Sequence, residues 1–371
     1  MFMKLMFRDA IIKGKSFGAE KNIHGEVVFN TAMSGYVETL TDPSYYGQVL
    51  VLTYPVQGNY GVPDINFESD RIQVAGLIVS HYSENPSHYT QKRSLGDWLK
   101  SQNIPAMCDV DTRTLTRYLR EHGTAPADLL SSDYISGDEI VKFKSEDFLA
   151  EVVSSKTVRY GKGESKILFI DTGAKENIVR CLVSRGASVI KAPWNTDWEK
   201  YLPEVDGVFI ANGPGDPMEA LSLIDRVREI LYCGLPFFGI CFGNQLISIA
   251  AGARTIKMKY GHRSVNQPVR SLRSGKCYIT SQNHGYVVQN ESLPHDWEPW
   301  FVNLNDGTNE GIRHKTKPIR SVQFHPEARP GTNDTAFLFD DFLTTVKEMK
   351  KERKVSDHIE KLEMAEIDCV A

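Results

Sequence analysis

A cysteine placed between two glycines carries the clearest chemical signal in this 371-residue sequence. In the stretch GICFG, Gly239 and Gly243 bracket Cys241, after an apolar run and before a helix-like pattern. This spacing is typical of a nucleophile elbow, a strand-to-helix turn too tight for side chains at the flanking positions. The elbow would place the thiol at a helix N-terminus, where the helix dipole favours the thiolate. Cysteine is also commonly a small buried hydrophobe, so the pentapeptide alone leaves both interpretations open.

A thiol nucleophile needs a base within hydrogen-bond reach and a group that orients the base. The later stretch SVQFHPEARPG places His325 after an apolar strand, with Pro326 to stiffen the turn and Glu327 two residues on. That spacing allows the carboxylate to reach back to the imidazole. A lone His-Pro-Glu can equally be a loop histidine with its hydrogen bonds satisfied, but together with the elbow it favours a Cys–His–Glu triad.

A third motif, NGPGDP, follows another apolar strand and carries Gly213 and Gly215. Glycines there let backbone N–H groups approach a substrate carbonyl, so one of them could join the N–H of Phe242 in an oxyanion hole. The same letters also form ordinary turn pairs. The motif lacks the third glycine of a dinucleotide fingerprint, and the KGKS segment at 13–16 lacks the upstream glycine of a phosphate-binding loop. We therefore expect no ATP site and no cofactor in this chain.

These motifs lie in a segment where strands and helices alternate. Apolar strands at 166–171, 187–194, 205–210 and 235–240 alternate with helical patterns at 175–186, 217–234 and 242–253. Such alternation predicts an open, mostly parallel sheet flanked by helices. The part before residue 145 has short β-type runs at 25–30, 48–55 and 74–80, and one helix from Asp111 to Gly123, which predicts an α+β domain. The fold class is therefore α/β, and we predict domains at 1–145 and 166–350, a linker at 146–165 and a charged helical tail at 351–371.

Composition excludes several classes of protein. The net charge of −4 and scattered Lys and Arg give no basic footprint for nucleic acid. The N-terminus is too interrupted by charge to be a signal peptide or a membrane span, and it fits a first strand better. The six cysteines are dispersed without a C-x-x-C pair, which predicts neither disulfides nor a structural metal site and suits the reducing cytoplasm. No metal ligand is predicted.

The three motifs, in this order, resemble those of class I (triad) glutamine amidotransferases. The resemblance implies that Cys241 attacks the side-chain amide of glutamine, His325 protonates the leaving ammonia and Glu327 orients His325. It also implies that Gln245, in the first turn after the elbow, contacts the glutamine; without the resemblance it reads as a helix-surface residue.

The N-terminal half, and the stretches DTGAKENIVRCL and KMKYGHRSVNQPV, resemble the small glutaminase subunits of carbamoyl phosphate synthetases, from about Phe7 to Val346. This resemblance adds Ser44, Asn283, Gly285 and Tyr286 to the glutamine site. It implies a ligase whose large synthetase subunit, using ATP and Mg²⁺, makes carbamoyl phosphate for arginine or pyrimidine synthesis. A heterodimer, or an assembly of heterodimers, is expected.

One position departs from the family pattern: Asn244 stands where the elbow usually has histidine. We expect activity to survive, although the affinity for glutamine could differ. The alternatives are another amidotransferase of the anthranilate synthase or GMP synthetase type, a non-catalytic regulatory protein on the same fold, and a cysteine hydrolase of peptides.

Overall fold

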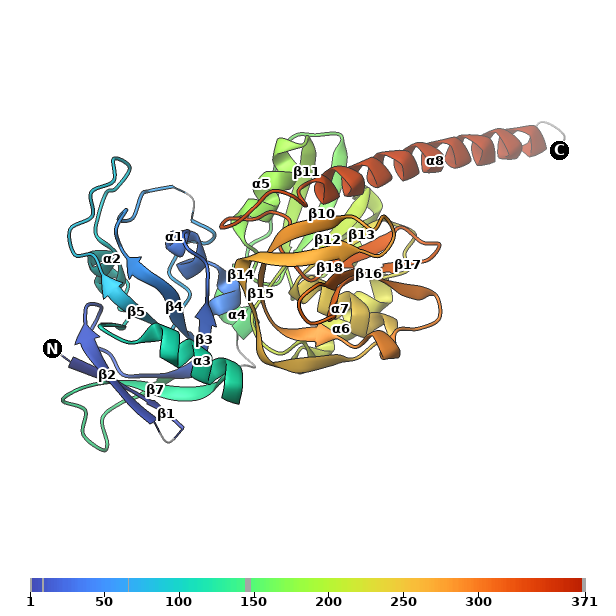
Figure 1. Cartoon of the computed structure of the whole chain (residues 1–371). Helices are drawn as coiled ribbons and strands as arrows, with labels where there is room; N and C mark the ends of the chain where they lie inside the picture. Colours follow the sequence, from blue (N-terminus) through green and yellow to red (C-terminus); the bar gives the residue numbers. More distant parts are fainter. Residues whose placement is uncertain (1, 9, 66, 144–147, 369–371) are drawn as a thin grey trace.

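The computed structural model shows two sheets, each with its own helices, that meet along one side (Figure 1). It describes residues 2–8, 10–65, 67–143 and 148–368, with the backbone alone for 356–368. The hairpin of β14 (Thr255–Ser271) and β15 (Cys277–Val288) lies at the boundary with the N-terminal part. Residues far apart in the sequence therefore meet at this boundary.

The N-terminal part is built on an eight-stranded sheet. Its order is β4-β5-β6-β2-β1-β7-β3-β8, and β4 also pairs with β3, so seven of the strands form a closed ring. The strands are β1 (Phe2–Phe7), β2 (Ala10–Ser16), β3 (Ile23–Asn30), β4 (Gln48–Gln57), β5 (Gly76–Tyr82), β6 (Ala106–Cys108), β7 (Ala125–Ser131) and β8 (Val141–Lys142). The helices are α1 (Tyr36–Leu40), α2 (Leu95–Ser101) and α3 (Thr112–His122). The predicted helix after Asp111 is confirmed, because the Asp111 side chain accepts from the N–H of Thr114 and Gly123 ends the helix.

The C-terminal part is built on a ten-stranded sheet. Its order is β15-β14-β16-β17-β18-β13-β12-β10-β11-β9. The strands besides β14 and β15 are β9 (Val158–Tyr160), β10 (Ser165–Asp171), β11 (Ala187–Pro193), β12 (Gly207–Ile210), β13 (Phe237–Ile240), β16 (Trp297–Asn303), β17 (Asn309–His314) and β18 (Ile319–Val322). The five central strands β11, β10, β12, β13 and β18 are parallel, as the alternating pattern predicts. Antiparallel strands extend this parallel centre on both sides.

Helices cover both faces of the parallel strands because side chains alternate along each strand. In β10, Leu168 and Ile170 pack against α6 (Leu221–Ile230) and α7 (Phe242–Ala251). Ile167 and Phe169 pack on the opposite face against α5 (Glu176–Ser184) and the start of α8 (Phe337–Asp368). This arrangement confirms the predicted α/β class and places the carboxyl ends of the strands, where ligands bind in such sheets, toward the active-site loops.

Two segments outside the sheets' cores are the predicted linker and the charged tail. The segment at 146–165, predicted as a linker, contributes α4 (Phe148–Val152) and the edge strand β9, while residues 146–147 lie outside the described residues. The charged C-terminal segment is helical, as predicted, and forms the part of α8 that projects beyond the body of the molecule (Figure 1). Cys369 and the end of the tail lie outside the described residues.

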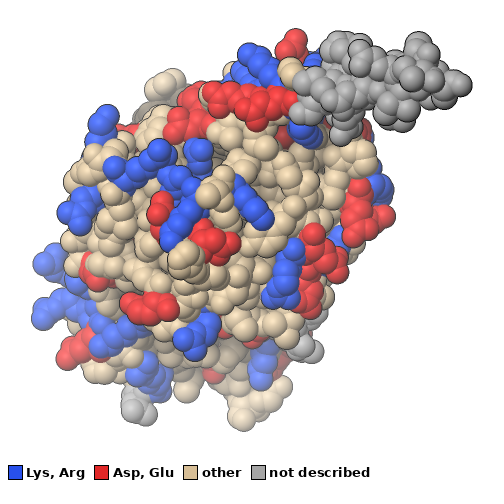
Figure 2. Space-filling view, turned by 90° about the vertical axis from the view of Figure 1, so that its right-hand side faces the viewer, with Lys and Arg blue, Asp and Glu red and all other residues tan. Residues whose placement is uncertain are grey.

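The surface shown in Figure 2 carries Lys and Arg side chains interspersed with Asp and Glu. On this face the two signs of charge are mixed, and the net charge of the sequence is −4. Among the described helices, none combines the length and the apolar character needed to cross a membrane.

Candidate active site

Cys241 sits on a strained turn between β13 and α7. Its φ of 54° is unusual for a residue with a side chain, and its N–H donates to the carbonyl of Val322 on the adjacent strand, 2.8 Å away. A Cβ on Gly243 would lie 2.4 Å from the carbonyl oxygen of Ile210, and one on Gly239 would lie 2.7 Å from Ile247. Only glycine fits at both flanking positions, so the elbow predicted from the sequence is present.

His325 and Glu327 lie together behind this elbow. The chain leaves β18 and makes a backbone bond from His325 N to Ser281 O at 2.8 Å, and the His325 Nδ1 lies 2.6 Å from Glu327 Oε1. Both side chains are fully buried. The other ring nitrogen, Nε2, has no nitrogen or oxygen partner among the described residues, and the Cys241 side chain acts on His325 electrostatically. The structure thus brings the three predicted triad residues together.

The charges of this group are set by burial and by mutual attraction. Burial disfavours the imidazolium, but the charge of Glu327, the neighbouring Cys241 side chain and the hydrogen bond to Glu327 outweigh it and raise the pKa of His325 to about 10. Burial also disfavours the carboxylate, yet Lys175 and His325 lower the pKa of Glu327 to about 2. At neutral pH the pair is therefore an imidazolium and a carboxylate, and the imidazolium can donate a proton from the ring nitrogen on the Cys241 side.

Lys175 is a fourth member of this group that the sequence analysis missed. Its Nζ lies 3.0 Å from Glu327 Oε1 and also donates to the carbonyl of Ala328, with only 3% of the side chain exposed. Burial opposes its charge, but Glu327 and Glu68 raise the pKa of Lys175 above its usual range. A buried lysine is rarely unpaired, but nothing in the sequence marks Lys175 as buried, since it lies more than 150 residues before its partner.

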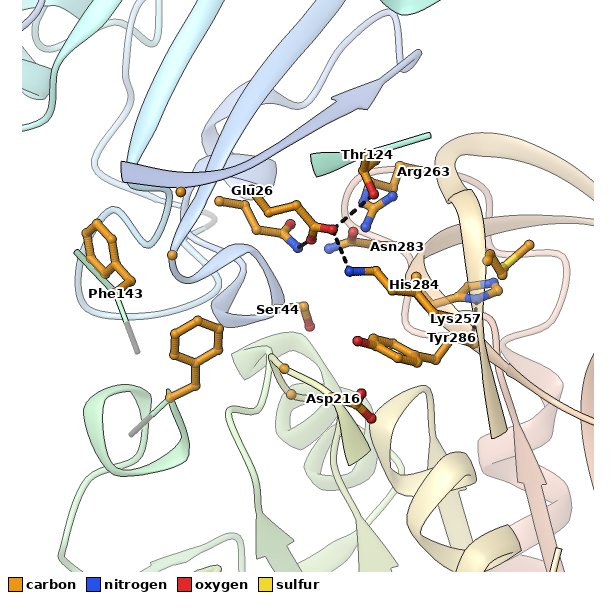
Figure 3. Close-up of a pocket in the computed structure, with 18 of the residues that line it drawn as sticks. Glu26, Ser44, Thr124, Phe143, Asp216, Lys257, Arg263, Asn283, His284 and Tyr286 are labelled. Atoms are coloured by element: carbon orange, nitrogen blue, oxygen red, sulfur yellow. Dashed lines mark hydrogen bonds and ion pairs between the residues drawn. The ribbon is translucent and has the colours of Figure 1, made fainter. Parts of the chain in front are cut away.

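A cavity of about 350 Å³ opens above Cys241 between the two halves of the chain. The predicted residues that line it are Ser44, Gly213, Gly215, Cys241, Gln245, Asn283, Gly285 and Tyr286. Figure 3 shows Ser44 facing Tyr286 and Asp216 across this cavity. Phe242 does not line it, because its side chain is packed in the core, so only its backbone can serve the site.

Side chains from both halves are hydrogen-bonded across the cavity wall. Asn212 donates to Ser44 Oγ at 2.8 Å, and Asn283 donates to Asp42 Oδ2 at 3.1 Å. Asp42 Oδ1 in turn accepts from the N–H of Ser44. Asp42 and Asn212 were not singled out from the sequence, because they stand in segments typical of turns and become partners only when the two sheets meet.

A second set of bonds crosses the boundary between the two halves. Lys257, on β14, forms an ion pair across the boundary with Glu26 on β3 at 2.9 Å (Figure 3). Thr124, in the same half as Glu26, donates to Glu26 Oε1 at 2.9 Å and holds that carboxylate in place. Near the start of α5, Glu68 accepts from the N–H of Asn177 at 2.9 Å. The cavity is therefore held between two halves that are tied together on several sides.

The loop NGPGDP, predicted as an oxyanion loop, passes close to other backbone beside the cavity. A Cβ on Gly213 would lie 2.1 Å from the carbonyl oxygen of Thr172, and Gly215 has a φ of 93°. Both residues line the cavity next to the elbow. Glycine at each position lets the backbone pass close to whatever occupies the cavity.

The two residues that follow the elbow lie in different environments. The amide of Gln245 lines the cavity and donates to Tyr286 O and Gln323 Oε1, at 3.1 and 3.2 Å. Asn244 is fully buried away from the cavity, where it donates to Gln323 Oε1 and accepts from Ser321 Oγ. The unusual Asn244 therefore joins α7 to β18 and does not line the cavity.

Comparisons with known proteins match both halves of the chain. Residues 5–129 match the family described as the carbamoyl-phosphate synthase small chain, CPSase domain, and residues 168–345 match glutamine amidotransferase class-I. Carbamoyl phosphate synthase arginine-specific small chains of Neosartorya fischeri and Debaryomyces hansenii are each 46% identical to the chain. The alignments cover 92% of this chain, and 78% and 84% of those relatives.

A longer protein also aligns with nearly the whole chain. The multifunctional protein URA2 of Saccharomyces cerevisiae is 44% identical over 383 residues, which cover 92% of this chain and 17% of that protein. The family matches at 5–129 and 168–345 include Ser44 of the cavity wall, the elbow and the triad. The chain belongs to the family of carbamoyl phosphate synthase small chains, with a class I glutamine amidotransferase domain.

Proposed function

We propose that this chain hydrolyses the side-chain amide of glutamine through a thioester on Cys241. One observation carries the proposal: a cysteine on a strained elbow faces a cavity, and a Glu327-bound imidazole lies behind it. This is the arrangement that nucleophilic catalysis by a thiol requires.

In the first half of the reaction, Cys241 Sγ attacks the amide carbon of the substrate as a thiolate, its proton having passed to His325, and the new C–S bond forms. The carbonyl oxygen becomes a negatively charged oxyanion. The N–H of Phe242 and the glycine loop at Gly213 and Gly215 stabilise this charge. His325, charged at neutral pH, then gives its proton to the departing nitrogen. Ammonia leaves, and a γ-glutamyl thioester remains on Cys241.

In the second half, the now neutral His325 takes a proton from water. The hydroxide attacks the thioester carbon, and the C–S bond breaks to give glutamate and the free cysteine. Glu327, backed by Lys175, holds the Nδ1–H side of the imidazole in place through both halves. We assign Ser44, Gln245, Asn283, Gly285 and Tyr286 to binding of the glutamine, because all of them line the cavity.

We further propose that the ammonia passes to a large synthetase subunit, which uses it with bicarbonate, ATP and Mg²⁺ to make carbamoyl phosphate. The names of the relatives as small chains support such a partner. The arginine-specific relatives and URA2 leave both arginine and pyrimidine synthesis as destinations of the product. We place the complex in the cytoplasm, where dispersed free cysteines are kept reduced.

The test is glutaminase activity of the purified chain, alone and with the large chain that co-purifies with it. Cys241→Ser should lose activity by about 10³-fold or more while keeping its association with the partner. Cys233→Ser, which changes an exposed cysteine, is the matched control and should retain full activity. Retention of glutaminase activity in Cys241→Ser would contradict the mechanism, and turnover of peptides in place of glutamine would contradict the substrate.

A further inference from the structure

Three chemically active side chains form a buried cluster outside the triad. His262 on β14, His284 on β15 and Glu310 on β17 come from three different strands, and each is less than one-tenth exposed. Glu310 Oε1 lies 3.2 Å from His262 Nδ1 and 3.7 Å from His284 Nε2. One ligand atom from each residue lies within 4.8 Å of the other two.

The outer nitrogens of the two imidazoles fix where their protons lie. His262 Nε2 lies 2.9 Å from Asp306 Oδ2, and His284 Nδ1 lies 3.0 Å from the carbonyl of Tyr286. Both partners can only accept a hydrogen bond, so each outer nitrogen carries the hydrogen. In a neutral imidazole the other, inner nitrogen then carries a lone pair. These inner nitrogens, Nδ1 of His262 and Nε2 of His284, both lie next to Oε1 of Glu310.

With both imidazoles neutral, the centre of the cluster is rich in electron pairs. Asn303 Nδ2 lies 3.1 Å from Glu310 Oε1 and 3.3 Å from His262 Nδ1 and can donate to either, whereas Gln282 Oε1 adds another oxygen 3.3 Å from His284 Nε2. The second oxygen of Glu310, Oε2, is buried with no hydrogen-bond partner among the described residues. A buried carboxylate in this situation requires a cation or additional protons at its centre.

We propose that His262, His284 and Glu310 bind a divalent transition-metal ion of the Zn²⁺ type. Imidazole and carboxylate are ligands that Zn²⁺ accepts, at bond lengths of about 2.0–2.2 Å. Ligands at those lengths in a tetrahedron lie about 3.3 Å apart, close to the spacings of the inner atoms. A carboxylate on His262 and a carbonyl on His284 are the outer contacts that metal-bound histidines usually make.

This site would be structural and distinct from the catalytic triad. His284 lines the glutamine cavity together with its neighbours Asn283 and Gly285, so an ion there would join β14, β15 and β17 at the cavity wall. The sequence analysis predicted no metal ligand, because it looked for cysteine pairs. The ligands come instead from strands that meet only in the folded sheet.

The experiment measures metal on the full chain without a histidine tag. The protein is stripped with EDTA, dialysed, and titrated with Zn²⁺ or with Co²⁺, whose visible absorption bands report tetrahedral ligands. Expected results are one ion per chain by elemental analysis, a higher Tm with Zn²⁺, and loss of binding in Glu310→Gln and His262→Gln. Asp306→Asn, at a more exposed residue, should keep the fold and weaken binding by about 10- to 100-fold.

Two control variants separate this site from other places that hold metal. His295→Gln, at an exposed histidine, and Cys241→Ser, at the catalytic thiol, should both bind the ion as the wild type does. A folded wild-type chain that takes up no Zn²⁺ or Co²⁺ would overturn the proposal and leave a purely hydrogen-bonded cluster. Undiminished binding in Asp306→Asn, or loss of binding in Cys241→Ser, would overturn it even if the other ligand variants failed to fold.

Discussion

At the scale of single residues, the site contains a row of alternating charges: Lys175 is positive, Glu327 negative and His325 positive. The row ends at the Cys241 side chain. Each member of this row stabilises the charged form of the next against the cost of burial. Lys175 and Glu327 are almost wholly buried, so water cannot solvate the charge of either one if its partner is removed. The lysine therefore acts on the chemistry only through Glu327.

Replacing Lys175 by methionine should show this dependence as a loss of stability. Glu327 would keep a buried negative charge with one partner fewer, which costs about 3–5 kcal/mol when a buried pair is broken. Thermal and denaturant unfolding of Lys175→Met measure the loss. Lys162→Met, at an exposed lysine, is the control and should unfold like the wild type; equal stability of the two variants would contradict a buried pair.

Replacing Glu327 by glutamine should change the pH dependence of catalysis. In the wild type the charge of Glu327 overcomes burial and holds the pKa of His325 at about 10, so the proton donor is lost only as the pH rises toward that value. Without the charge, burial dominates and the pKa of His325 falls. The alkaline limb of kcat/KM should move to lower pH by about one unit or more.

Profiles of kcat/KM against pH for the two proteins give the shift directly. The exposed substitution Glu291→Gln serves as the control and should leave the profile in place. An unmoved alkaline limb in Glu327→Gln would mean that Glu327 does not set the protonation of His325.

At the scale of elements, the elbow depends on close contact between α7 and the parallel strands. Gly243 N donates to the carbonyl of Ala211, which directly follows β12. Cys241 N donates to the carbonyl of Val322, the last residue of β18. Asn244 and Gln245 share the amide oxygen of Gln323. The helix is thus anchored on both sides of the cysteine, which holds the strained φ in place.

The substitution Gly243→Ala tests that contact. The new methyl group would lie 2.4 Å from the Ile210 carbonyl, so α7 must shift away from the strand. We expect a destabilisation of about 1–3 kcal/mol and, because the nucleophile moves with the helix, a fall in kcat of about 100-fold. Ala251→Gly weakens the far end of the same helix and should leave kcat unchanged; an active Gly243→Ala would show that the close approach is dispensable.

The sequence predicted those elements whose pattern is visible within a short stretch of residues. Strand–helix alternation gave the parallel centre, and the three motifs gave Cys241, His325, Glu327 and the glycine loop. It did not predict the closed ring of the N-terminal sheet or the contacts of Lys175, because these pairings join segments distant along the chain. Hydrophobic period records which face of an element is buried, but not which element lies against it.

At the scale of the whole molecule, the contact between the two halves contains a carboxyl group with an unusual charge state. Glu68 accepts from Asn177 N and lies 3.5 Å from Arg180, with its side chain fully buried. Burial outweighs its cationic neighbours and raises the pKa of Glu68 to about 7. The boundary therefore changes its charge near neutral pH.

The stability of the molecule should fall as the pH rises through this range. The folded chain holds a proton on Glu68 between about pH 4.5, the ordinary value, and about 7, whereas the unfolded chain has released it. Glu68→Gln stays neutral and can still accept from Asn177. The difference in Tm between the variant and the wild type should therefore shift in favour of the variant as the pH rises from 5 to 8. Scanning calorimetry measures this difference.

The exposed substitution Glu84→Gln is the control for that series and should follow the wild type at every pH. A constant difference in Tm between Glu68→Gln and the wild type would mean that Glu68 has the same charge in the folded and unfolded chains.

The shared cavity wall has a consequence for how this protein can change over generations. A recombination that joined the glutaminase half to a foreign N-terminal half would keep the triad but discard Ser44 and Asp42. The resulting gene would encode a nucleophile whose cavity has lost the N-terminal part of its wall. Selection should therefore keep the two halves together as one heritable unit, while exchanges at the far end of α8 leave the wall intact.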